Sequence, residues 1–114
     1  MSGSVEIQEV RRRAANDTIQ HTVVFALMHA PGSAKEEGFL ADAHRILSGI
    51  PGVRDFTVNR QVSAKSALSW QFSMVFADRA TYAAYDAHPE HTAFVKERWM
   101  NEVNQFQEYD FTAR

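Results

Sequence analysis

The sequence contains no cysteine, which excludes disulfides, thiolate metal sites and cysteine nucleophiles. It has no apolar run near the roughly 20 residues of a membrane span, and its N-terminus lacks the basic-then-apolar order of a secretory signal. Excess positive charge is also missing, since 12 Lys and Arg stand against 14 Asp and Glu. We therefore expect a cytoplasmic protein that binds neither nucleic acid nor a membrane.

Aromatic side chains, in contrast, are plentiful. The 114 residues include 8 Phe, 3 Tyr and 2 Trp. A chain of this length forms one domain with one core. The aromatic complement exceeds what such a core needs, so the sequence predicts that some of it lies at an interface.

Two regions differ in character. Residues 1–17 are polar and form an N-terminal extension, in which the alternation of Val5 and Ile7 would allow a short extra strand. Residues 18–114 form the domain. Its expected strands are 18–29, 53–62, 68–77 and 106–112, and its expected helices are 34–48, 79–87 and 90–104. This order predicts an α+β, ferredoxin-like βαββαβ fold, with a four-stranded antiparallel sheet and helices on one face.

The third strand alternates strictly between two kinds of side chain. One face carries Trp70, Phe72, Met74 and Phe76, and the other carries Ser69, Gln71 and Ser73. We expect the aromatic face to be the one that the helices leave bare. Water would not tolerate such a patch, so a second subunit should cover it and make the protein a homodimer. Ser69 and Gln71 should then point toward the helices.

A Tyr85-x-x-His88-Pro89-x-His91 corner separates the last two expected helices. Proline ends one helix and is tolerated in the first turn of the next, which fixes His91 relative to Tyr85. A phenol beside an imidazole that titrates near neutrality allows acid/base chemistry. In the alternative interpretation the imidazoles cap helix ends and the tyrosine packs in the core.

Several short motifs along the chain occur in the order typical of one family. They are Ile19-Gln20-His21-Thr22-Val23-Val24-Phe25, Ile50-Pro51-Gly52-Val53, Met74-Val75-Phe76, the Tyr-His-Pro-His corner and Tyr109-Asp110-Phe111. Over about residues 18–112 the chain resembles the stress-responsive α/β-barrel domain family. The resemblance implies a dimeric α+β barrel, in which two sheets face each other across a two-fold axis. One plant branch of this family cyclises polyketides by an aldol condensation.

The resemblance also implies roles for individual residues. Tyr85 and His91 resemble the acid/base pair of that cyclase, His21 resembles the histidine at the mouth of its pocket, and Asp110 matches a nearby carboxylate. A buried imidazole needs a partner, so we expect Asp110 to orient His91 and raise its basicity. Alternatively, His21 is a core histidine with its hydrogen bonds satisfied.

The remaining expected contacts concern the substrate. Ser69 and Gln71 should form the pocket floor, and His88 is a further candidate for ligand contact. Because these polar residues would stand where the cyclase branch has apolar ones, a small polar ligand fits better than an alkyl chain. His88 and His91 could chelate a metal, but no third ligand of suitable spacing is visible, so we expect no metal and no cofactor.

Three classes of function follow from the sequence. The first is a cofactor-independent lyase, cyclase or isomerase that uses Tyr85 and His91. The second is a non-enzymatic stress or ligand-binding protein whose corner is structural. The third is a cofactor-independent monooxygenase or haem-degrading enzyme of the related dimeric barrels.

Overall fold

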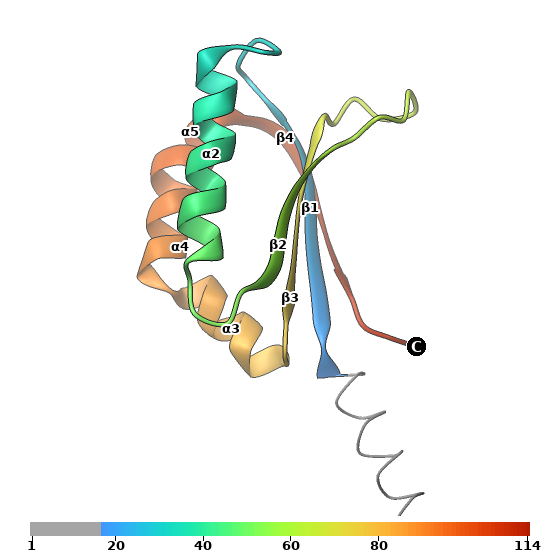
Figure 1. Cartoon of the computed structure of the whole chain (residues 1–114), viewed down its shortest axis with the longest axis vertical. Helices are drawn as coiled ribbons and strands as arrows, with labels where there is room; N and C mark the ends of the chain where they lie inside the picture. Colours follow the sequence, from blue (N-terminus) through green and yellow to red (C-terminus); the bar gives the residue numbers. More distant parts are fainter. Residues whose placement is uncertain (1–16) are drawn as a thin grey trace, which may run out of the picture.

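In the computed structural model, residues 17–114 are described, so the predicted extension lies outside the described residues except for Asp17. The strands are β1 (Ile19–Leu27), β2 (Arg54–Arg60), β3 (Trp70–Phe76) and β4 (Val103–Phe111). They pair antiparallel in the order β2-β3-β1-β4. All labelled helices pack on one face of this sheet (Figure 1). The predicted ferredoxin-like βαββαβ fold is confirmed.

Helix α2 (Ala34–Ser48) agrees with the expected helix over residues 34–48, and its N-cap is Ser33. The Ser33 Oγ accepts the Glu36 N–H at 3.2 Å. The Glu36 carboxylate accepts the Gly32 N–H at 2.9 Å and, through its other oxygen, the Trp70 Nε1–H at 3.3 Å. One buried carboxylate therefore ties the first turn of α2 to strand β3.

The His-Pro corner joins two helices as predicted. Helix α3 (Arg79–Ala87) ends at His88, and α4 (Pro89–Phe94) starts with proline at its first position. The His88 Nδ1 accepts the Glu90 N–H at 3.1 Å, which satisfies one free donor of α4.

The C-terminal helix is interrupted. A π-helical turn (Val95–Trp99) and a short α5 (Met100–Glu102) follow α4, and β4 begins at Val103 without a loop. The expected single helix to residue 104 and strand from residue 106 are therefore wrong in their bounds. The backbone becomes extended at Val103, which pairs with Leu27 next to an irregularity in the β1–β4 register.

The faces of β3 are the reverse of those expected. Trp70, Phe72, Met74 and Phe76 are all buried in the core, which also contains Phe25 and Phe39 on β1 and α2. Gln71, which lies between Trp70 and Phe72 along the strand, points to the opposite face, where its side-chain amide donates to Thr22 Oγ1 at 2.8 Å. The alternation correctly divided the side chains of β3 between two faces. The helices pack on the aromatic face, because their own apolar side chains are buried against it.

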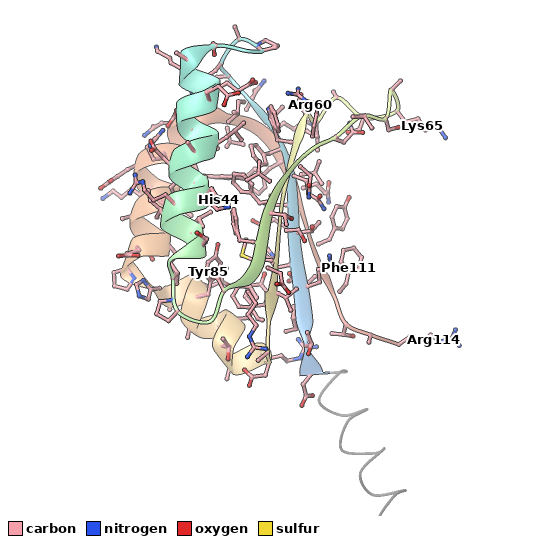
Figure 2. All side chains as sticks on the ribbon, viewed as in Figure 1. His44, Arg60, Lys65, Tyr85, Phe111 and Arg114 are labelled. Atoms are coloured by element: carbon pink, nitrogen blue, oxygen red, sulfur yellow. The ribbon has the colours of Figure 1, made fainter. Side chains whose placement is uncertain are left out.

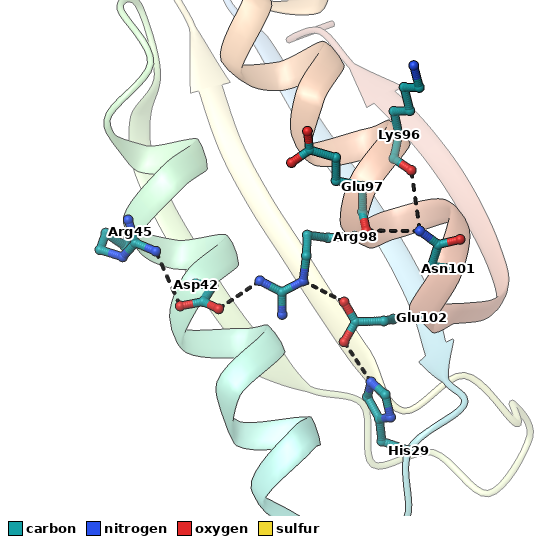
Figure 3. A network of polar contacts seen from close by, with 8 residues as sticks. All are labelled: His29, Asp42, Arg45, Lys96, Glu97, Arg98, Asn101 and Glu102. Atoms are coloured by element: carbon teal, nitrogen blue, oxygen red, sulfur yellow. Dashed lines mark hydrogen bonds and ion pairs between the residues drawn. The ribbon is translucent and has the colours of Figure 1, made fainter.

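Helix α2 is also held to the C-terminal helix by a chain of charged groups (Figure 3). Arg98 donates from Nη1 to Asp42 Oδ2 at 2.7 Å and from Nε to Glu102 Oε2 at 2.5 Å. The Nε2 of His29 lies 2.7 Å from the second oxygen of Glu102. Within residues 17–114, no helix is long and apolar enough to cross a membrane.

Candidate functional site

A cavity of about 520 Å³ lies between the helix-facing side of the sheet and the C-terminal helices. Its polar end is lined by His21, Tyr82, Tyr85, Asp86, His91 and Glu108. The rest of its wall is apolar and includes Phe72, Met74, Phe94, Trp99 and Phe106. The expectation of a pocket with a polar floor is wrong, since β3 turns its aromatic face inward. Size and lining are typical of a site for a small molecule with an apolar body.

His21 and Asp110 face each other across strands β1 and β4. Their register pairs them directly, and Asp110 Oδ1 lies 2.7 Å from His21 Nδ1. The Tyr82 hydroxyl donates to both oxygens of Asp110, at 2.9 and 3.1 Å, and its oxygen lies 2.7 Å from His21 Nδ1. A carboxylate only accepts, so the His21 proton is on Nδ1 and the Nε2 lone pair is left available.

Tyr82 was missed by the sequence analysis. Its ring stacks on Phe76 with centroids 4.8 Å apart and planes 1° apart. Burial raises the pKa of Tyr82, and the Asp110 carboxylate adds to this by its hydrogen bond and charge. The available signal was its position three residues before Tyr85, which places both phenols on the sheet-facing side of α3.

The Tyr85 side chain lies between the helices and the sheet (Figure 2). Only 2 % of it is exposed, and its ring centroid lies 4.5 Å from that of His91 and 5.0 Å from that of Phe76. Its hydroxyl makes no hydrogen bond to any residue in the described part of the chain, yet it is not fully buried and belongs to the cavity wall. Burial raises the pKa of Tyr85, and the charges of Asp86 and Glu108 raise it further, so the hydroxyl remains a proton donor.

His91 is not a partner of Asp110. Its Nδ1 lies 3.1 Å from the carbonyl oxygen of Asp86, at the end of α3. The expected His91–Asp110 hydrogen bond is therefore wrong, because the β1–β4 register pairs Asp110 with His21 instead. A carbonyl oxygen accepts, so His91 also carries its proton on Nδ1 and leaves Nε2 free to accept one.

The other predicted contact residues lie away from the cavity. His88 caps α4, and Gln71 is on the outer face of the sheet. The backbone of Ser69 accepts the Gln61 N–H just after β2 and donates to the Phe25 carbonyl on β1. In residues 17–114, neither these three nor Asp110 is among the cavity-lining residues, although Asp110 contacts two that are. The same part of the chain contains no group of three His, Cys, Asp or Glu residues arranged to hold a metal ion.

The sequence model of the stress responsive A/B barrel domain matches residues 19–113, nearly the whole described chain. The chain belongs to the stress responsive A/B barrel domain family. A solved structure of a family member with a ferredoxin-like fold, from Mesorhizobium loti, is 49 % identical with a TM-score of 0.85. The alignment covers 85 % of this chain and 97 % of that one. The comparison with curated proteins finds no match.

Two enzymes share the fold of this A/B barrel domain at lower identity. The hydroxynitrile lyase of Passiflora edulis is 13 % identical with a TM-score of 0.72, over 87 % of this chain and 95 % of that one. The cofactor-independent oxygenase SnoaB of Streptomyces nogalater, in a mutant form, is 20 % identical with a TM-score of 0.67, over 86 % and 94 %. Two further proteins with this fold are described as dimeric and of unknown function.

Proposed function

We propose that this A/B barrel domain is a cofactor-independent acid/base enzyme of the lyase type. Its substrate would place an apolar body against the aromatic wall and a hydroxyl or carbonyl group at the polar end. The observation that carries the proposal is the arrangement of His21, Tyr85 and His91. Both imidazoles have Nδ1 engaged by oxygen and Nε2 available, and a phenol without a hydrogen-bond partner among residues 17–114 lines the same cavity.

The roles follow from which atoms carry protons, since both imidazoles have theirs on Nδ1 and Tyr85 has a hydroxyl proton to donate. His91 takes the proton of a substrate hydroxyl while the adjacent carbon–carbon bond breaks and a carbonyl forms. The departing carbanion takes up a proton, so one substrate gives two products without a change in oxidation state. Tyr85 donates a hydrogen bond to the substrate oxygen, and His21, oriented by Asp110 and Tyr82, accepts at Nε2 a hydrogen bond from a separate donor group of the substrate.

The test uses cyanohydrins and β-hydroxy ketones with an aromatic body, such as mandelonitrile, and follows release of the aldehyde. We expect His91→Ala to abolish turnover and Tyr85→Phe to lower it by roughly 10²–10⁴-fold. Asp110→Asn should lower turnover less, since it disorients His21 without removing it. His44→Ala is the matched control, because this histidine packs on Phe56 away from the cavity.

Other outcomes would favour the alternatives. Full activity in both His91→Ala and Tyr85→Phe would refute the assigned roles. Ligand binding without turnover across the panel would favour a non-enzymatic binding protein. Oxygen uptake with a phenolic substrate would favour the oxygenase class, for which the SnoaB fold is the supporting observation.

We further propose that the protein is a homodimer. The fold is shared with proteins described as dimeric, and in residues 17–114 no helix covers the outer face of the sheet (Figure 1). This outer face, rather than the aromatic face of β3, is the surface available to a second copy. The cytoplasmic location expected from the sequence stays a prediction.

A further inference from the structure

Negative charge gathers at the polar end of the cavity. Asp86 and Glu108 line it, and Asp110 is hydrogen-bonded to its wall through His21. Among the described residues, those that line the cavity include no lysine or arginine. The side chain of Arg98, on the adjacent π-helical turn, is engaged by Asp42 and Glu102. Lys96 lines only a shallow groove outside, next to Asp86 and His91.

The end of α3 adds to this negative potential. The carbonyl groups at a helix C-terminus carry partial negative charge, and here the Asp86 carbonyl points to His91. The last turn of α3 contains no basic residue, and Asp86 itself is in that turn. The Asp86 carboxylate lies near the partially negative C-terminus of α3, which lowers the stability of the helix. We therefore attribute the position of this charge to a role in the cavity.

The cavity walls beyond these carboxylates are aromatic. The indole of Trp99 meets Phe106 edge-to-face with centroids 5.6 Å apart, and the Tyr85 ring lies at the polar end. Among residues 17–114 the Tyr85 hydroxyl has no hydrogen-bond partner, and its buried side chain lines this space. Aromatic faces attract organic cations, and a phenol oxygen can accept a hydrogen bond from an ammonium group.

We propose that this cavity selects ligands that carry an organic ammonium group on an apolar body, and that it rejects carboxylates and phosphates. The proposal rests on the same cavity as the proposed function and narrows its substrate class. An amine-bearing substrate would place its cation near Asp86 and Glu108 and its apolar part against Trp99 and Phe106. Its reacting oxygen would then lie near His91.

Three probes of matched shape test the selection: benzyltrimethylammonium, its neutral isostere neopentylbenzene, and the anion phenylacetate. Dissociation constants are measured by tryptophan fluorescence and calorimetry. We expect the cation to bind about tenfold or more tightly than the anion. Added salt should reduce this difference in affinity and leave the affinity of the neutral probe unchanged. Asp86→Asn and Glu108→Gln should each weaken cation binding by about two- to fivefold and leave the neutral probe unchanged, since both carboxylates are exposed.

Glu97→Gln is the control, because Glu97 is an exposed carboxylate on the π-helical turn and does not line the cavity. Equal affinity for the three probes, preference for the anion, or equal weakening of cation and neutral probe in the variants would overturn the inference. The readout is binding, so cation selection without turnover would refute only the proposed enzyme activity. Turnover of anionic substrates in preference to cationic ones would refute only this inference.

Discussion

Tyr82 and Tyr85, three residues apart on α3, have their hydroxyls protonated for related reasons. Burial is the main cause for both, and nearby carboxylates add to it, namely Asp110 for Tyr82 and the pair Asp86 and Glu108 for both. Each phenol is therefore a hydrogen-bond donor throughout the physiological pH range. This property suits Tyr82 to orient Asp110, and it is what the proposed function requires of Tyr85.

We predict that tyrosine ionisation in the folded protein is incomplete above pH 10. The chain has 3 tyrosines, and the pKa values of two of them are raised. The absorbance rise near 295 nm on alkaline titration should fall short of that of the denatured protein by up to two tyrosine equivalents. Tyr82→Phe and Tyr85→Phe should each remove part of the shortfall. An identical rise in folded and denatured protein would contradict the burial of these hydroxyls.

The same shifts make stability depend on pH. The unfolded tyrosine loses its proton near pH 10, while the folded one retains it, so the folded state binds more protons above that pH. The free energy of unfolding should therefore decrease as the pH rises from about 10 toward the higher folded pKa values.

At the level of residues, the sequence predicted which side chains matter better than how they pair. His21, Tyr85 and His91 all line the cavity, as motif and spacing suggested. The partner of Asp110 could not be obtained from spacing, because it depends on the β1–β4 register, in which a shift of one residue exchanges the faces of a strand. Tyr82 was missed because its role needs that same carboxylate.

At the level of elements, Arg98 connects α2 to the C-terminal helix, as Figure 3 shows. Hydrogen bonds from Arg98 and then Arg45 lower the pKa of Asp42. Burial acts to raise the pKa of Glu102, but hydrogen bonds from Arg98 and His29 outweigh it and the net shift is downward. We predict that Arg98→Met lowers the free energy of unfolding by about 1–2 kcal/mol at neutral pH.

The pH dependence distinguishes this network from simple packing. Two carboxylates with lowered pKa values stabilise the fold above their ordinary values of 3.8 and 4.5, and this contribution is lost as the pH falls through the folded values. Acid unfolding below about pH 4.5 should therefore be less steep in Arg98→Met than in the parent. Arg45→Gln is the comparison and should change the acid slope less, since the Arg45 side chain is 71 % exposed and its ion pair with Asp42 is longer, at 3.3 Å. An unchanged acid slope in Arg98→Met would contradict the prediction.

Elements with strong end signals were predicted closely. The bounds of α3 and α2 agree with the structure because Asp78 and Ser33 are N-caps and a proline or glycine follows each helix. The π-helical turn has no comparable signal, since it differs from α-helix only by one extra residue in a turn. The inward face of β3 could not be chosen from the strand alone, because both sides of the sheet were candidates for burial.

At the level of the whole molecule, a stacked pair of aromatic residues marks the outer face of the sheet. Tyr109 and Phe111 lie on β4 with ring centroids 6.1 Å apart and are 46 % and 51 % exposed. Figure 2 shows Phe111 on the side away from the helices. We predict that Phe111→Glu shifts a dimer toward monomer in sedimentation at micromolar concentration, since a charge on an apolar contact surface opposes association.

A substitution on the opposite face of the same strand provides the comparison. Phe106 is exposed to a similar extent but lines the cavity. Phe106→Glu should therefore alter ligand binding and leave the assembly unchanged. A monomeric parent protein, or loss of the dimer in both variants, would show that the outer face is not the interface.

The pairing of His21 with Asp110 joins residues 89 positions apart, on the first and last strands of the sheet. During synthesis on the ribosome, the N-terminal strand is made first, and β1 has one unpaired edge until residues 103–111 have emerged. The cluster of His21, Tyr82 and Asp110 is therefore assembled only when the last strand docks. A chain truncated before β4 would expose the backbone of β1 as an open edge, on which another nascent chain could add a strand.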